Sequence, residues 1–414
     1  MPDSTAFPAS GRQAVILCGG LGTRLGKLTT DTPKPMLPLR GKPLLQHSIE
    51  KLRDEGFDDF LLAAGYKAEV IRDHFEKLDL GVRIRVFEES LPLGTAGPLR
   101  LLEAELADDF LVLYGDVFID FHVAELWQAH RAHRPSATLL VRPSDHPWDS
   151  DLVKVDGAGR IIGFLKAREP RSRPRNLANA AVYAVSRSVL PWVEPGQSAD
   201  FVRDLFPKVL AARGELRSHL FSGEGFLKDM GTPERLEKVE RYLEERDWIE
   251  AARASGPGPL KTVFLDRDGV LNEDSDLIDR PERLKLLPGA AEAVAQLNRA
   301  GLEVIVVTNQ PVIARGLCTL ETLEAIHLRL QQLLAESGAH LDALYFCPHH
   351  PETHHGEGVE NLRVACACRK PQAGMIFRAV RERAVDLASS LLIGDRDVDA
   401  EAARRAGIRF LAVG

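Results

Sequence analysis

Residues 263–272 restrict the fold of this chain more than any other stretch, because an apolar run leads directly into two carboxylates. Residues 263–265 are apolar and are followed by Asp266 and Asp268, and then by Gly269. Such a run is typical of a buried parallel strand, and a glycine after it marks a turn. In a parallel α/β sheet, ligands bind beyond the carboxyl ends of the strands. The two carboxylates are therefore expected at a binding site.

Two carboxylates at this spacing can divide the work of phosphoryl transfer. One attacks phosphorus to form an aspartyl-phosphate, while the other protonates the leaving oxygen and later activates water. A calcium loop or a plain Asp-Gly turn would share the local sequence. Polar groups that hold phosphate or Mg²⁺ recur downstream and favour phosphoryl transfer. They are Thr308 and Asn309 after a second apolar strand at 304–307, then Arg369 and Lys370, and then Asp395 after a third strand at 391–394.

Taken in order, these groups resemble the haloacid dehalogenase phosphatases over residues 261–414. The resemblance implies that Asp266 is the nucleophile and that Asp268 is the general acid and base. It also implies that Thr308 and Lys370 hold the phosphoryl group. The amide of Asn309, at the same strand end, is suited to phosphate oxygens.

The same resemblance implies a Mg²⁺ site. Its ligands would be the carboxylates of Asp266 and Asp395 together with the main-chain carbonyl of Asp268. Asp399 lies one helical turn beyond Asp395. We expect it to support the site rather than to bind the metal.

Three of the five cysteines gather with one histidine in a C-x-H…C-x-C pattern: Cys347, His349, Cys366 and Cys368. Three thiols and an imidazole are the ligand set of a closed structural zinc site. Incidental or buried cysteines are the alternative. The cluster lies beside proline and outside the apolar strands, which favours zinc.

This loop resembles that of the D-glycero-D-manno-heptose 1,7-bisphosphate 7-phosphatases. Histidinol phosphatases share the loop, so zinc alone does not select the substrate. By the resemblance, Arg369 faces the substrate. One departure is Pro311-Val312, where the family pattern has Ser-Gly.

The N-terminal half begins with an apolar strand at 14–18 and a glycine-rich turn at 19–26. Glycines let main-chain N–H groups approach a triphosphate closely. Prolines on both sides of Lys34 keep that residue in an extended segment. Together these features resemble the sugar-1-phosphate nucleotidyltransferases. The implied nucleotide-binding residues are Gly19, Gly20, Gly22 and Thr23. Arg24 and Lys34 are the implied catalytic residues, which offset charge on the triphosphate and the leaving pyrophosphate.

Further matches to the same family follow in order along the chain. Gly94 and Thr95 lie in the expected base-recognition loop, and Asn179 in the sugar-binding strand. Asp116 and Asp229 are the implied ligands of a second Mg²⁺ ion.

Three positions depart from this family. Tyr114 replaces an asparagine, Lys166-Ala167 replaces a Glu-Lys pair in the sugar-phosphate strand, and Ala181 replaces a glycine. Lys166 or Arg168 can supply the missing charge, although a solvated surface lysine is the alternative.

The whole chain is expected to form two Rossmann-like α/β domains with open, mostly parallel sheets. The expected segments are a tail at 1–11, a nucleotidyltransferase domain at 12–252, a linker at 253–260 and a phosphatase domain at 261–414. The net charge of -7 argues against nucleic-acid binding. No apolar run reaches membrane-spanning length, and reduced thiols fit the cytoplasm.

Two interlocking resemblances predict a bifunctional enzyme of nucleotide-activated heptose synthesis. A heptose bisphosphate phosphatase releases heptose 1-phosphate, which a nucleotidyltransferase then joins to a nucleotide. GTP is the expected donor, because the first domain most resembles mannose- and heptose-1-phosphate guanylyltransferases. One alternative is an active phosphatase with a nucleotide-sugar-sensing first domain. Another is a mannose-1-phosphate guanylyltransferase fused to a histidinol-phosphatase-like enzyme.

Overall fold

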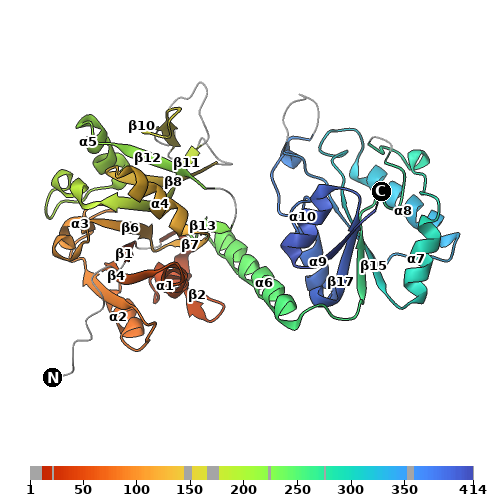
Figure 1. The fold of residues 1–414 in the computed structure, drawn as a ribbon, viewed down its shortest axis with the longest axis horizontal. Coiled ribbons are helices and arrows are strands. Elements are labelled where there is room, and N and C mark those ends of the chain that lie inside the picture. The colour runs from red at the N-terminus through yellow and green to blue at the C-terminus, as the bar shows by residue number, and fades with distance from the viewer. Residues whose placement is uncertain are drawn as a thin grey trace. The chain divides into compact units, whose positions relative to one another are not determined.

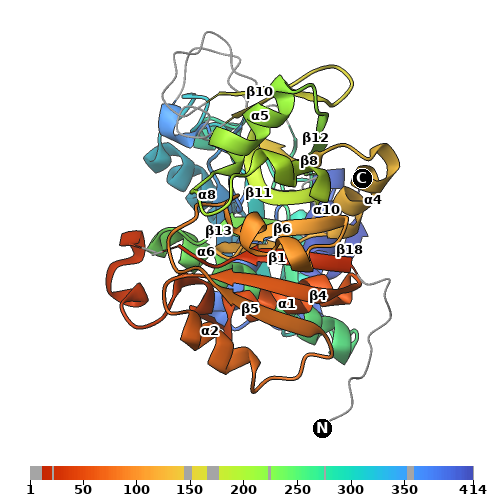
Figure 2. The same cartoon turned by 90° about the vertical axis from the view of Figure 1, so that its left-hand side faces the viewer.

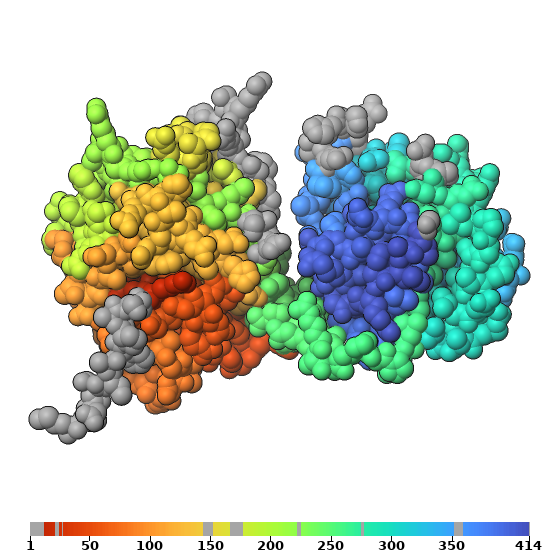
Figure 3. All heavy atoms as spheres, in the orientation of Figure 1, coloured from red at the N-terminus to blue at the C-terminus, as the bar shows by residue number. Residues whose placement is uncertain are grey.

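The chain divides into two compact units, residues 1–242 and 243–414. The computed structural model describes residues 12–20, 23–143, 152–165, 177–221, 225–274, 277–351 and 359–413, but not the side chains of residues 23, 24 and 27. Residues of uncertain placement are grey in Figure 3. Within the described residues, no helix has the length and apolar character needed to cross a membrane.

The first unit is built on a nine-stranded mixed sheet. Figure 2 shows its parallel part, in which neighbouring strands follow the order β5, β4, β1 and β6. Strand β11 runs antiparallel to β6 and pairs with both β8 and β9. The strands are β1 (Arg12–Leu17), β4 (Phe57–Ala64), β5 (Arg83–Glu88), β6 (Asp109–Tyr114), β8 (Ala137–Pro143), β9 (Leu152–Val155), β10 (Ile161–Leu165), β11 (Leu177–Ser186) and β12 (Leu216–Leu220).

Side chains alternate between the two faces of this sheet, and each face has its own core. Ala14 and Ile16 belong to one core, and Val15 between them belongs to the other. Residues of α1 (Leu44–Asp54), α2 (Ala68–Phe75) and α4 (Val123–His133) complete the first core. Residues of α3 (Pro98–Leu101) and α5 (Phe206–Ala211) complete the second.

Two short two-stranded sheets lie outside the large sheet. Strand β7 (Val117–Asp120) pairs antiparallel with β13 (Phe226–Asp229). Strand β2 (Pro38–Leu39) pairs with β3 (Lys42–Pro43).

The second unit contains a five-stranded, wholly parallel sheet in the order β16, β15, β14, β17, β18. Helices α7 and α8 cover one face and α9 and α10 the other (Figure 1). The strands predicted at 263–265, 304–307 and 391–394 are confirmed. The elements are β14 (Thr262–Leu265), α7 (Ala290–Arg299), β15 (Glu303–Asn309), α8 (Leu320–Ala335), β16 (Ala343–Cys347), α9 (Gly374–Arg383), β17 (Ser390–Gly394), α10 (Asp397–Ala406) and β18 (Arg409–Ala412).

Helix α6 (Pro233–Ser255) continues past residue 252, the expected end of the first domain, and its last turn includes residues 253–255 of the expected linker. Trp248, Ile249 and Ala252 pack against the core beside α9 and α10. These three residues lie on one face of the helix because of their spacing. The C-terminal half of α6 is therefore part of the second unit.

Candidate active sites

In the second unit, the ends of β14, β15 and β17 gather the predicted phosphatase residues. Leu265 pairs with Val306 on one side and Ile393 on the other, so the residues after these strands meet at one edge. Lys370 reaches this edge from the loop before α9. Its Nζ atom lies 2.8 Å from Oδ1 of Asp266.

Asp266, Asp395 and Asp399 bring carboxylate oxygens within 4.8 Å of one another. Burial raises the pKa of Asp266 to about 6; Lys370 opposes this rise and Asp399 adds to it. Within the described residues, Oδ1 of Asp395 is buried and accepts no hydrogen bond. Three carboxylates near one ammonium leave excess negative charge and open oxygen atoms, which fits a hard divalent cation such as Mg²⁺.

Asp268 is held by three side chains that the sequence did not single out. Arg267 donates to it from Nε at 3.0 Å and from Nη2 at 2.8 Å. Asn272 donates at 2.9 Å and Gln310 at 2.8 Å. Burial acts to raise the pKa of Asp268, but these donors outweigh burial and lower it. Gln310 also donates to Thr308 at 2.9 Å, so one amide joins two predicted site residues.

An open cavity of about 970 Å³ is lined by Asp266, Arg267, Asp268, Thr308, Gln310, Lys370 and Asp395. Arg315, Arg369 and Arg396 also contribute to its wall. Nη1 of Arg369 donates to the carbonyl of His349 at 3.0 Å, which fixes the arginine against the loop of the cysteine cluster. The cavity is thus rich in the cationic groups that a phosphorylated ligand needs.

Asn309 also lines this cavity, but its amide is engaged by the main chain of Lys370. It donates to the carbonyl of Lys370 at 3.0 Å and accepts from its N–H at 2.9 Å. The geometry shows Asn309 holding the loop that carries Lys370.

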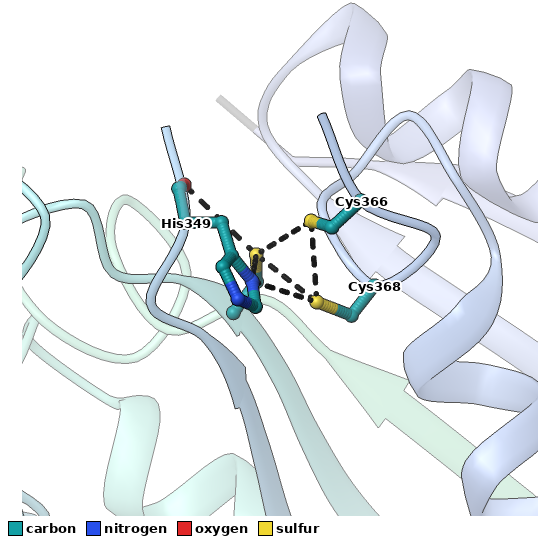
Figure 4. Close-up of side chains that lie close together, drawn as sticks. His349, Cys366 and Cys368 are labelled. Carbon is teal, nitrogen blue, oxygen red and sulfur yellow. Dashed lines mark hydrogen bonds between the residues drawn. The ribbon is translucent and has the colours of Figure 1, made fainter. Parts of the chain in front are cut away.

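The four predicted zinc ligands converge. Sγ of Cys368 lies 3.3 Å from Sγ of Cys347, 3.3 Å from Sγ of Cys366 and 3.3 Å from Nδ1 of His349. Figure 4 shows His349, Cys366 and Cys368 pointing toward one another from separate parts of the loop. Three sulfurs and one ring nitrogen at these separations fit a single tetrahedral zinc ion.

In the first unit, a cavity of about 450 Å³ is lined by Gly19, Gly20, Lys34, Gly94, Thr95 and Asp116, all predicted site residues. Lys34 is buried, and its Nζ atom lies 2.5 Å from Oδ2 of Asp116. Asp229 lies beside Asp116, since β13 pairs with β7 and the N–H of Met230 donates to the carbonyl of Asp116 at 2.8 Å. Arg235 forms an ion pair with Asp229.

The predicted base-recognition loop closes tightly around Gly94. This residue has a φ of 75°, and a Cβ atom there would lie 2.5 Å from the carbonyl of Ala199. The position therefore requires glycine. The hydroxyl of Thr95 donates to Asp200 at 2.8 Å, which holds the loop in place.

Glu89 is a further lining residue that the sequence did not single out. A Cβ atom on Gly19 would lie 2.9 Å from Oε1 of Glu89, so glycine allows the carboxylate to enter the cavity. Oε2 accepts from the N–H of Leu93 at 3.2 Å. Burial raises the pKa of Glu89, with Leu93 acting in the opposite direction.

Asn179 is not among the residues that line this cavity. Its amide donates to the hydroxyl of Tyr183 at 2.6 Å, and Tyr183 lies 3.5 Å from the hydroxyl of Tyr114, a lining residue. The pairing of β11 with β8 is irregular between Asn179 and Tyr183, and Ala181 within it has a φ of 59°. This irregularity turns Asn179 toward Tyr183.

Some predicted residues lie outside the described part of the structure. They are Gly22, the side chains of Thr23 and Arg24, and Lys166, Ala167 and Arg168.

Comparison with protein families matches both units. Residues 13–246 match the nucleotidyl transferase model, and residues 367–414 match the HAD-hydrolase-like model. A probable mannose-1-phosphate guanylyltransferase 1 of Oryza sativa is 34% identical over 270 residues, which cover 63% of this chain and 73% of that protein. The mannose-1-phosphate guanylyltransferase of Mycobacterium tuberculosis is 35% identical over 224 residues, covering 53% of this chain and 61% of that protein.

Two solved structures resemble one unit each. HddC from Yersinia pseudotuberculosis is 24% identical, with a TM-score of 0.49, and the match covers 56% of this chain and 99% of that protein. A D,D-heptose 1,7-bisphosphate phosphatase from B. bronchiseptica, complexed with magnesium and phosphate, is 40% identical, with a TM-score of 0.33. That match covers 36% of this chain and 79% of the phosphatase. From its family matches, the chain belongs to the nucleotidyl transferase family through residues 13–246 and carries a HAD-like domain after them.

Proposed function

We propose that this protein is a bifunctional enzyme of nucleotide-activated heptose synthesis. The second unit removes the 7-phosphate of D-glycero-D-manno-heptose 1,7-bisphosphate. The first unit then transfers GMP from GTP to the heptose 1-phosphate and releases pyrophosphate. The observation that carries this proposal is the presence of both sites in one chain. A sugar bisphosphate phosphatase releases a sugar 1-phosphate, and a sugar-1-phosphate nucleotidyltransferase consumes one.

In the phosphatase step, Asp266 attacks phosphorus and forms an aspartyl-phosphate as the sugar oxygen leaves. Lys370 and Thr308 hold the phosphoryl oxygens, and Mg²⁺ held by Asp266, Asp395 and the carbonyl of Asp268 would supply charge stabilisation there. Asp268 passes a proton to the leaving oxygen. The carboxylate left by this transfer then removes a proton from the water that hydrolyses the intermediate.

The cysteine cluster and the arginines of the cavity wall support a bisphosphate substrate. His349 and Cys368 of the cluster hold Arg369 between them, since its guanidinium contacts the His349 carbonyl and its main chain follows Cys368. Arg315 and Arg396 line the same cavity, so a second phosphate can meet cationic groups beyond Lys370.

In the transfer step, an oxygen of the sugar phosphate attacks the α-phosphorus of the nucleotide. Lys34 offsets charge on the triphosphate and the leaving pyrophosphate. Asp116 and Asp229 would hold Mg²⁺, which supplies further charge stabilisation there.

Glu89 supports guanine as the base. Guanine presents two donors, N1–H and N2–H₂, on one edge, and a carboxylate can accept both. Oε1 of Glu89 faces Gly19 within the cavity, while Leu93 holds Oε2. The guanylyltransferase relatives point to the same donor nucleotide.

The test follows both products in one assay. Protein with Mg²⁺ and either anomer of D-glycero-D-manno-heptose 1,7-bisphosphate should release phosphate, and adding GTP should then release pyrophosphate. Asp266→Asn should abolish phosphate release but still yield pyrophosphate from heptose 1-phosphate and GTP. Absence of phosphate from both anomers would overturn the phosphatase assignment. Absence of pyrophosphate with every nucleotide would overturn the transferase assignment and favour a sensing role for the first unit.

A further inference from the structure

In the first unit, each of the two carboxylates expected to hold Mg²⁺ is paired with a cation of the chain itself. Lys34 pairs with Asp116 at 2.5 Å, and Arg235 pairs with Asp229. The two pairs are neighbours, because Asp229 lies opposite Val117 in the β7–β13 pairing. The side chains of Arg235 and Asp229 are 36% and 33% exposed, so both can exchange partners with a ligand.

The charges of the substrates require more than one cation. The reaction brings a triphosphate and a sugar phosphate together, whereas the described wall of the cavity contains Glu89, Asp116 and one cation, Lys34. Lys34 already has the triphosphate as its expected partner. The strand that provides a lysine for the sugar phosphate in the family has Lys166-Ala167 at that position. The side chain of Arg24, and Lys166 and Arg168, lie outside the described part of the structure; among the described residues, Arg235 is a further cation beside the metal carboxylates.

We propose that Arg235 binds the phosphate of the sugar 1-phosphate and that a divalent cation at Asp116 and Asp229 releases it for this purpose. This role rests on the proposed nucleotidyltransferase activity. A divalent ion competes with the guanidinium for the oxygens of Asp229. The released guanidinium has the planar, two-donor geometry that matches phosphate. Arg235 lies in the first turn of α6, six residues after Asp229, and so stays close to the metal carboxylates.

The proposal predicts that replacing Arg235 strengthens the binding of a divalent ion and weakens the binding of the sugar phosphate. Without its guanidinium, Asp229 has no cation to displace, so a divalent ion binds more tightly. The sugar phosphate loses a charge-assisted contact and binds more weakly. A residue that only maintained the fold would weaken both ligands together.

The experiment uses full-length protein carrying Asp266→Asn and Asp395→Asn, which removes the metal site and hydrolysis of the second unit. Mn²⁺ is titrated first, and then heptose 1-phosphate and mannose 1-phosphate at saturating Mn²⁺, by calorimetry. Arg235→Gln removes the charge, and Arg235→Lys retains it. Arg53→Gln is the matched control, because Arg53 is 38% exposed and pairs with Asp54 elsewhere in the unit.

We expect Arg235→Gln to tighten Mn²⁺ binding by about threefold or more and to weaken sugar-phosphate binding by about tenfold or more. Arg235→Lys should restore most of the sugar-phosphate affinity, and Arg53→Gln should match the background protein. Unchanged or weaker Mn²⁺ binding, or unchanged sugar-phosphate binding, in Arg235→Gln would overturn the role of Arg235. Failure of the background protein itself to bind either sugar phosphate would instead overturn the proposed function.

Discussion

Lys370 places its Nζ atom 2.6 Å from Oδ1 of Asp399, with the two side chains 2% and 0% exposed. The same Nζ atom also contacts Asp266. One buried ammonium therefore pairs with two buried carboxylates. Lys370, Asp266 and Asp399 together carry a net negative charge when all three are ionised.

Replacing Lys370 with methionine should destabilise the second unit by about 3–5 kcal/mol at pH 7 without Mg²⁺, because it leaves two buried carboxylates with no cation. Asp399→Asn should cost much less, since Lys370 and Asp266 remain as a neutral pair. Urea unfolding measures both. Lys261→Met, which breaks an exposed pair with Asp386, is the control. Equal losses in Lys370→Met and Asp399→Asn would contradict this charge argument.

Glu89→Gln should lower kcat/KM for GTP by about 10- to 100-fold, because a carboxamide cannot accept both donors of the guanine edge. Discrimination between GTP and UTP should fall at the same time. Pyrophosphate release with each nucleotide measures this. Glu88→Gln is a matched control, because Glu88 is exposed and pairs with Arg72. An unchanged ratio of GTP to UTP activity in Glu89→Gln would exclude guanine recognition by this carboxylate.

Freshly purified protein should contain zinc, and Cys366→Ser should lose it. The second unit should then melt at a temperature lower by about 10 °C or more, because a structural zinc site contributes directly to folding stability. Metal analysis and calorimetry provide the two measurements. Cys318→Ser, which lies outside the cluster, should keep both the zinc and the melting temperature. Protein that is fully folded and free of zinc would rule out the structural site.

His327 should make the second unit less stable in mild acid. Burial, together with the charge of nearby Arg267, lowers its pKa to about 3, whereas the unfolded chain has a value of 6.5. Between these values the unfolded state binds more protons, so the free energy of unfolding falls as the pH falls from 6.5 toward 3. Lowering the pH from 7 to 5.5 should cost about 1 kcal/mol through this residue.

Urea unfolding at the two pH values should therefore show a smaller pH dependence for His327→Gln than for the unsubstituted protein. His340→Gln is the control, because His340 is exposed. Identical pH dependence in all three proteins would show that His327 does not carry the effect.

The sequence alone located the site residues that lie at the end of a single apolar strand. Asp266 follows β14 directly, and Thr308 belongs to the predicted strand β15, so apolar patterning located both. The partners of Asp268 could not be found in this way. Arg267 and Asn272 turn toward it because the chain folds back after β14, as shown by the N–H of Asn272 donating to the carbonyl of Arg267 at 3.1 Å.

In the first unit, too, local sequence patterns do not locate every residue of the site. Glu89 enters the cavity because its N–H donates to the carbonyl of Ala64 at 2.7 Å, which brings the end of β5 beside the glycine-rich turn. Asn179 carries the expected residue type, but the irregular pairing of β11 directs it to Tyr183. Such positions depend on contacts between strands that are distant in sequence, and local patterns do not encode them.

The cysteine cluster is continuous with two residues that we propose to bind the substrate, since Cys368, Arg369 and Lys370 follow one another in the chain. A metal ion bound to Cys347 and Cys368 would close the intervening chain into a ring and remove much of its conformational entropy. The entropy cost of ordering this loop would then arise once, during folding, and not again each time a substrate binds. Binding energy from the substrate could then be used to hold the phosphate against Asp266 rather than to order the loop.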